Sequence, residues 1–336
     1  MTRRFRHLTP WLGLLAAAWL IVGLFGAGSY LGDYVRFRGF APPRDPPGVS
    51  VGRVERVRFY SPAVRAWKYY LIYTPPGYRA AAARGERFPV LYLLHGGPSI
   101  PEDYIRIGAV AVTYDIELDG HRVRPMLIVM PYGRMHAGPP DTEWSNTREG
   151  RYEDLVLDAV HAVDTQWPTR ADRRHRMLAG FSTGAYAAAN ITLHHLAVFG
   201  SFESWSGYFV EDRKAAFKTE PEANVLRNSP ALYVSSLRPE LRRFPVIASL
   251  YQGRQDHEKS YMIAFAQRLR VAGSQATYAF YRGKHSWRLW RYRMKYELRY
   301  ASQVLTAPPP RRRAHRRAHH ARHRSAARHR RAGAGG

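Results

Sequence analysis

Residues 176–196, RMLAGFSTGAYAAANITLHHL, decide the fold of this chain. The run RMLAGF is short and apolar, which predicts a buried strand, and the run AYAAANITLHHL predicts a helix. Between them, Gly180-Phe181-Ser182-Thr183-Gly184 has the spacing G-x-S-x-G, in which a serine occupies a sharp strand-to-helix turn flanked by glycines. Strand, motif and helix in this order predict a nucleophilic Ser182. A serine that merely caps the helix is the alternative interpretation.

Outward from this stretch, apolar strand patterns alternate with helical spacing. We expect strands at 56–62, 68–75, 88–97, 125–131, 200–207, 244–253 and 276–283, and helices at 151–167, 258–272 and 286–305. Strands alternating with helices predict an α/β fold, with a mostly parallel central sheet flanked by helices. Ligands on such sheets bind beyond the carboxyl ends of the strands.

A serine hydroxyl needs a general base, and the base needs an orienting acid. Asp256 and His285 each follow a predicted strand, and they come after the serine in the order acid, then histidine. We therefore expect Ser182, Asp256 and His285 to form a catalytic triad. His257 is the rival base and Glu258 the rival acid.

An oxyanion formed on attack needs two N–H donors. The Thr183 amide follows the nucleophile, and Gly97 lies in the glycine turn after an early strand, so these two are the predicted donors. We expect Trp144 and Trp287 to contact substrate; ordinary core packing is the alternative for Trp144. The five histidines of residues 311–331 lack an orderly metal-ligand spacing.

At this point the chain resembles the esterase family of α/β-hydrolases that includes esterase D, enterochelin and feruloyl esterases and the mycolyltransferases of the mycobacterial envelope. The resemblance covers about residues 54–300. It is carried by Tyr73-Thr74-Pro75-Pro76-Gly77-Tyr78, Pro89-Val90-Leu91-Tyr92-Leu93-Leu94-His95-Gly96, Arg124-Pro125-Met126, Tyr152-Glu153-Asp154, Gly180-Phe181-Ser182-Thr183-Gly184 and Gly283-Lys284-His285-Ser286-Trp287 with Trp290.

The resemblance implies an α/β-hydrolase fold, no cofactor or metal, and the triad roles already given to Ser182, Asp256 and His285. It implies ester hydrolysis on a small-molecule, lipid or glycan ester, or acyl transfer to a sugar or other alcohol. A non-catalytic envelope-binding protein is the remaining alternative. Ala185 departs from the family, which often has a glycine there, but the start of a helix tolerates alanine.

The N-terminus begins with a basic flank, residues 1–7, followed by an uncharged apolar run. We expect a transmembrane signal anchor over 8–30, because its apolar section of about 21 residues extends roughly 31 Å as a helix. Cleavage near Gly26-Ala27-Gly28, which would give a secreted protein, is the alternative. The order of basic flank and apolar run favours an extracytoplasmic catalytic domain at the cell membrane. Residues 31–48 form a proline-rich linker, and the catalytic domain spans 49–306.

The formal net charge of +26 is concentrated toward the C-terminus, where 307–336 contain ten arginines and no acidic residue. This Arg/His-rich segment has almost no apolar bulk, so we expect a disordered tail that binds anionic envelope polymer or lipid headgroups. No zinc-finger, helix-turn-helix or RNP-like pattern accompanies the charge, so we expect no specific nucleic-acid partner. The chain has no cysteine, which excludes disulfides, thiolate zinc sites and a cysteine nucleophile.

Overall fold

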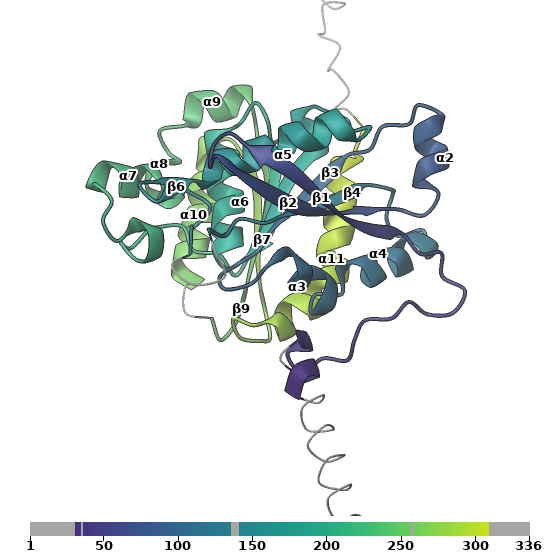
Figure 1. Cartoon of the computed structure of the whole chain (residues 1–336). Helices are drawn as coiled ribbons and strands as arrows, with labels where there is room; N and C mark the ends of the chain where they lie inside the picture. The colour runs from purple at the N-terminus through teal and green to yellow at the C-terminus, as the bar shows by residue number, and fades with distance from the viewer. Residues whose placement is uncertain (1–30, 35, 136–140, 257–258, 309–336) are drawn as a thin grey trace, which may run out of the picture. The chain divides into compact units, whose positions relative to one another are not determined.

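An eight-stranded, mostly parallel sheet forms the centre of the protein (Figure 1). The computed structural model describes residues 31–34, 36–135, 141–256 and 259–308. The strand order is β1-β2-β4-β3-β7-β8-β9-β10, and only β2 runs against its neighbours. The strands are β1 (Arg53–Ser61), β2 (Ala66–Thr74), β3 (Val90–Leu94), β4 (Leu127–Pro131), β7 (Arg176–Phe181), β8 (Ser201–Trp205), β9 (Ile247–Gly253) and β10 (Gln275–Tyr281).

Helices cover both faces of this sheet. Helices α5 (Tyr152–Gln166), α6 (Thr183–His194) and α10 (Lys259–Ala272) contribute to one buried apolar cluster, and α3 (Pro101–Arg106), α4 (Val110–Asp119) and α11 (Trp287–Leu305) contribute to the other. The sheet divides the clusters because side chains alternate along each strand: Tyr92 lies in the first cluster, while Leu91 and Leu93 lie in the second. The predicted α/β-hydrolase-like fold, with a parallel sheet between helical layers, is confirmed.

The predicted strands and long helices all form, with ends that differ by a few residues. The sequence patterns missed the short elements, which are α2 (Tyr78–Ala83), α3, α4, α7 (Glu222–Arg227), α8 (Pro230–Tyr233), α9 (Arg238–Arg243), the hairpin of β5 (Asn146–Thr147) and β6 (Gly150–Arg151), and the 3-10 turns η1 (Arg173–His175) and η2 (Ala215–Phe217). Most of these have two to six residues, too few to show a helical or strand period.

The predicted linker, 31–48, is only partly separate from the domain. Residues 41–48 lack helix and strand and are mostly exposed, as expected of a proline-rich segment. Phe37 is buried, however, and Phe40 packs against the cluster that contains α11. The packed part of the chain therefore begins before the predicted boundary at Val49.

Two terminal predictions fall outside the described residues. The predicted span over 8–30 and nearly all of the predicted tail, 307–336, belong to this undescribed part. Among the helices that the structure does describe, none combines the length and apolar character that crossing a membrane requires.

Candidate active site

Ser182 lies on a tight turn between β7 and α6. Its backbone has φ 56° and ψ −125°, a strained conformation for a residue with a side chain. The turn leaves no room beside it, since a Cβ on Gly184 would lie 1.9 Å from the carbonyl oxygen of Leu94 and one on Gly180 would lie 2.3 Å from it. The glycines of the G-x-S-x-G motif are thus required by the close approach of β3.

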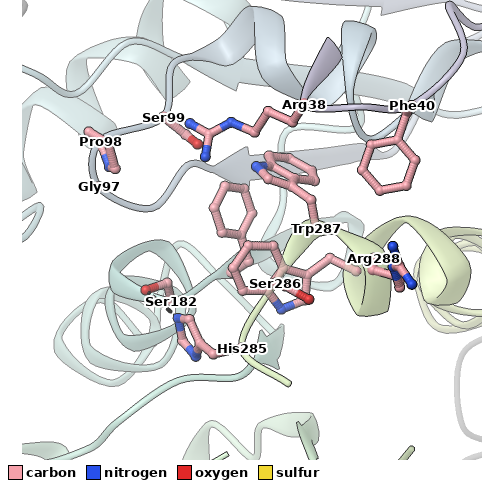
Figure 2. Close-up of a pocket in the computed structure, with 12 residues that line it drawn as sticks. Arg38, Phe40, Gly97, Pro98, Ser99, Ser182, His285, Ser286, Trp287 and Arg288 are labelled. Atoms are coloured by element: carbon pink, nitrogen blue, oxygen red, sulfur yellow. Dashed lines mark hydrogen bonds between the residues drawn. The ribbon is translucent and has the colours of Figure 1, made fainter. Parts of the chain in front are cut away.

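The structure brings Ser182, His285 and Asp256 together at the carboxyl ends of β7, β10 and β9. The Nε2 atom of His285 is 2.9 Å from the Ser182 hydroxyl, and its Nδ1 atom is 3.0 Å from the Asp256 carboxylate (Figure 2). Because an ionised carboxylate only accepts hydrogen bonds, Nδ1–H donates to Asp256 and Nε2 is left to accept from the serine. This is the arrangement in which a histidine can remove the serine proton.

The surroundings of the three side chains differ. Asp256 is buried, whereas the side chain of His285 is 41% exposed and packs edge-on against Trp290, with ring centroids 5.1 Å apart. The buried Asp256 carboxylate therefore orients the His285 imidazole, while the exposed part of the imidazole remains accessible to substrate and water. The rival residues His257 and Glu258 lie outside the described residues.

A pocket of about 420 Å³ opens beside the serine. Its lining combines the serine and histidine with aromatic and basic side chains (Figure 2). The lining residues are Arg38, Phe40, Gly97, Pro98, Ser99, Phe181, Ser182, His285, Ser286, Trp287, Arg288 and Trp290. Trp287, predicted to contact substrate, is therefore in the pocket wall.

Trp144 is not part of this wall. It is 1% exposed, and its indole N–H donates to the carbonyl oxygen of His95 at 2.9 Å. The prediction that Trp144 contacts substrate is therefore wrong for this pocket, and the alternative, core packing, is what the structure shows. The indole N–H therefore holds the loop after β3, which carries Gly96 and Gly97.

His95 is a second buried anchor of the same loop. Its Nε2 accepts the backbone N–H of Gly133 at 3.2 Å, which requires a neutral imidazole. Burial lowers the pKa of His95 to about 3, so the ring keeps this neutral form at ordinary pH. His95 thus holds the loop in place and is not a base.

The two residues predicted to supply the oxyanion donors both lie next to an acidic side chain, Asp141. Gly97 lines the pocket and Thr183 is the first residue of α6, and both face Asp141. The Thr183 hydroxyl donates to the Asp141 carboxylate at 3.3 Å, and a Cβ on Gly97 would lie 2.0 Å from the same oxygen. Burial raises the pKa of Asp141. A lone Asp in an irregular segment carries no spacing signal, so sequence reasoning missed this residue.

The segment 208–243 contributes no residue to the lining of this pocket. It packs behind the site instead, where the Tyr208 hydroxyl donates to the Glu143 carboxylate and its ring stacks on Tyr186. Burial, followed by the charge of Asp141, raises the pKa of Glu143 to about 8. The segment therefore supports the site from within the core.

A family model described as "Putative esterase" matches residues 68–301. The chain belongs to this esterase family. The matched range contains Ser182, Asp256 and His285. Ala185, the departure from the family's usual glycine, is buried at the start of α6 without disturbing the turn.

Individual relatives agree with the family. The endo-1,4-beta-xylanase/feruloyl esterase of Xylanibacter ruminicola is 27% identical over 169 residues, which cover 49% of this chain and 23% of that protein. The chain thus matches less than a quarter of that relative's length.

Solved structures share the fold. A ferulic acid esterase superposes with a TM-score of 0.67 at 21% identity, over 76% of this chain and 99% of that one. The S-formylglutathione hydrolase of Staphylococcus aureus superposes with a TM-score of 0.63 at 15% identity, over 75% and 99%. Family membership and fold together support a serine-hydrolase type of esterase.

Proposed function

We propose that the protein is a carboxylic ester hydrolase that forms an acyl-enzyme on Ser182. His285 takes the hydroxyl proton as the serine oxygen attacks the ester carbonyl, and Asp256 stabilises the imidazolium that results. The N–H groups of Gly97 and Thr183 stabilise the oxyanion. The imidazolium then protonates the departing alcohol. In the second step His285 activates a water molecule, which releases the acid and restores the serine.

The observation that carries this proposal is the pair of contacts at His285, 2.9 Å to the Ser182 hydroxyl and 3.0 Å to Asp256. One imidazole bridges a hydroxyl and a buried carboxylate at the mouth of a pocket. The backbone of Ser182 is strained, and a histidine with a purely structural role would not require such a serine beside it. The strain therefore favours a catalytic role for this pair.

The exposed edge of His285 favours water over another acceptor. Acyl transfer to a sugar or other alcohol requires exclusion of water from the acyl-enzyme. With its side chain 41% exposed, His285 is open to solvent at the point where deacylation begins. Hydrolysis is therefore the function that the geometry supports best.

The pocket wall suggests a first substrate. Phe181, Trp287 and Trp290 offer aromatic faces next to the serine, which suit a planar acyl group. Two of the similar proteins carry feruloyl or ferulic acid esterase in their names. We accordingly include methyl ferulate with short 4-nitrophenyl esters as assay substrates.

Replacement of the nucleophile tests the mechanism. Ser182→Ala should abolish hydrolysis of all these esters and labelling by a fluorophosphonate probe, because no other group can form the acyl-enzyme. Ser236→Ala, which changes an exposed serine outside the pocket, is the matched control and should keep both. Labelling that persists in Ser182→Ala removes this serine from the mechanism. A correctly folded wild type that resists every probe supports a non-catalytic binding protein instead.

We also propose that residues 8–30 anchor the protein in the cell membrane, with the catalytic domain outside the cytoplasm. A basic flank before a long apolar run supports this assignment. The protein should remain in the membrane pellet after alkaline carbonate extraction and be digested by protease added to intact cells. Release as a shortened soluble form supports cleavage near Gly26-Ala27-Gly28 instead.

The basic tail, 307–336, is proposed to bind anionic envelope polymer or lipid headgroups, because its arginines are unaccompanied by acidic residues. Binding to such material should weaken as salt increases and disappear on truncation at Pro310. The same binding in the truncated protein would exclude this role.

A further inference from the structure

The pocket wall facing the catalytic side chains comes from the predicted linker. Arg38 and Phe40 lie on one side of the pocket, and Ser182 and His285 lie on the other (Figure 2). The other lining residues all lie between Gly97 and Trp290, inside the range matched by the family model. Arg38 and Phe40 precede that range, which begins at residue 68.

Contacts hold this wall in place. Phe37 is buried, and the guanidinium of Arg291 lies 4.9 Å from the centre of the Phe40 ring. Arg291 also donates to the carbonyl oxygen of Ala41 at 3.5 Å. The backbone of Arg38 turns with φ 50°. Phe37 and Phe40, on either side of this turn, pack against the domain, while the Arg38 side chain stays exposed. The position of Arg38 is therefore set by its neighbours.

Arg288 lines the pocket from the first turn of α11. Trp287 and Trp290, on either side of it in the sequence, are both buried. Their rings pack against Phe181, with centroids 4.5 Å and 4.4 Å from it. This packing fixes the turn and leaves Arg288 exposed at the pocket.

Two guanidinium groups line the pocket. Two carboxylates contact lining residues from behind, Asp141 at Gly97 and Asp256 at His285, but neither is itself part of the lining. Within the described part of the chain, neither Arg38 nor Arg288 forms an ion pair or a hydrogen bond with another residue. Some exposed arginines of the domain have acidic partners, such as Arg56 with Glu102 and Arg213 with Glu222. Arg38 and Arg288 differ from the other unpaired arginines in their position, because they line the pocket that contains Ser182 and His285.

We propose that Arg38 and Arg288 form an anion-binding subsite, and that the substrate is an ester that carries a carboxylate or phosphate group. The inference rests on the proposed esterase function and adds the substrate class. The scissile carbonyl lies at Ser182, and the apolar part of the substrate lies on the aromatic wall. The anionic group reaches the guanidinium of Arg38 or that of Arg288, which lie at different parts of the pocket in Figure 2. Guanidinium binds both carboxylate and phosphate through paired N–H donors. The anion belongs either to a soluble ester or to the headgroup of a membrane lipid.

Matched substrates test the subsite on the full-length protein. The soluble pair is 4-nitrophenyl hydrogen suberate and its neutral methyl ester, which differ in the terminal charge and by one methyl group. The lipid pair is phosphatidylglycerol and phosphatidylcholine vesicles with the same acyl chains, with fatty acid release as the readout. Wild-type protein should prefer the anionic member of at least one pair.

Substitutions then assign the preference. Arg38→Ala and Arg288→Ala should each lower kcat/KM for the anionic substrate about fivefold, through KM, since exposed charge pairs have energies of this order. The neutral substrate should change less than about twofold. Lysine at either position should restore part of the preference. Arg44→Ala removes one charge from the same linker outside the pocket and should leave the preference intact.

The outcomes separate the two proposals. A preference confined to the soluble pair or to the vesicles, and lost in the variants, supports the subsite and identifies the source of the anion. Equal hydrolysis of anionic and neutral substrates, or a preference that survives both substitutions, overturns the subsite but leaves the esterase function standing. Failure to hydrolyse any ester overturns the esterase function and the subsite with it.

Discussion

Asp256 and Glu153 are both buried carboxylates that hold histidines, but they stand in different surroundings. Asp256 contacts one histidine, His285, whose other nitrogen faces the Ser182 hydroxyl at 2.9 Å. Glu153 contacts two: Nδ1 of His194 at 3.0 Å and Nε2 of His195 at 2.7 Å. The second nitrogen of His194 faces a backbone carbonyl at 3.0 Å, so this cluster ends in the main chain.

The comparison shows that a contact between a histidine and a carboxylate does not by itself indicate a catalytic site. Glu153 belongs to α5, and its partners His194 and His195 lie at the end of α6. These contacts join the two helices, so the cluster has a structural role. At Asp256 the hydrogen bonds lead through His285 to the hydroxyl of Ser182, whose backbone is strained and which lines a pocket. What the imidazole points toward decides between stability and chemistry.

Breaking the first arrangement should have the largest effect. Asp256→Asn should lower kcat of the esterase reaction roughly 10³- to 10⁴-fold, because an amide can donate to Nδ1 and so favours the wrong histidine tautomer. Thermal unfolding should change little, since the side chain keeps its shape. Initial-rate kinetics and thermal melting on the same preparation check both points. Activity within tenfold of the wild type contradicts the assignment of Asp256.

Breaking the second arrangement should affect folding instead. Burial alone raises the pKa of Glu153, but hydrogen bonds from His194 and His195 outweigh it and lower the pKa to about 2. Against the ordinary value of 4.5, this shift corresponds to roughly 3 kcal/mol of stability. Glu153→Gln should therefore lower the free energy of unfolding by about 2–3 kcal/mol, with kcat unchanged. Denaturant titration measures the loss, and a large fall in kcat in the folded variant would place Glu153 in the chemistry.

The pH dependence of this difference provides its control. A carboxyl with a lowered folded-state pKa stabilises the protein fully above its unfolded-state value, and the contribution is lost as the pH falls toward the folded-state value. The stability gap between wild type and Glu153→Gln should therefore be constant at neutral pH and close between about pH 4.5 and 2. A gap that is the same at pH 7 and pH 3 indicates that packing, not charge, accounts for the loss.

A third pair should give the smallest effect. Asp172 contacts Nδ1 of His175 at 2.6 Å and caps η1 by accepting the N–H of Arg174 at 2.9 Å, but its side chain is 55% exposed. Asn can serve the same cap, so Asp172→Asn removes only a solvent-screened ion pair. We expect less than about 1 kcal/mol in the free energy of unfolding and no change in activity. A loss as large as that of Glu153→Gln would show that exposure does not separate the two pairs.

The sequence predicted this fold well because its core elements carry strong local patterns. Strands β3, β4 and β7 are buried along their whole length, so each is a short run of mostly apolar residues in the sequence. The helix α5 buries one stripe, which appears as apolar residues three and four positions apart. Ser182 was found for the same reason, since its turn demands glycines at fixed spacing.

Features that depend on contacts between distant segments were missed or misjudged. Asp141 has no motif of its own and matters only because Gly97 and Thr183 meet beside it. Trp144 was predicted to contact substrate because it lies near polar residues in the sequence, yet it packs under His95. Arg38 was assigned to a linker, and nothing in its neighbourhood signals that it faces a catalytic pocket.

The sequence by itself determined the strand–turn–helix around Ser182, the order of acid and histidine after it, and the edge of the sheet where they meet. These follow from interactions within a few residues and from the rule that parallel strands end at one edge. Only the tertiary structure decided which atoms come within hydrogen-bonding distance across 103 residues, from Ser182 to His285, and which wall closes the pocket. Such contacts depend on how whole layers pack, because side chains far apart in the chain meet only after the sheet and its helices have assembled.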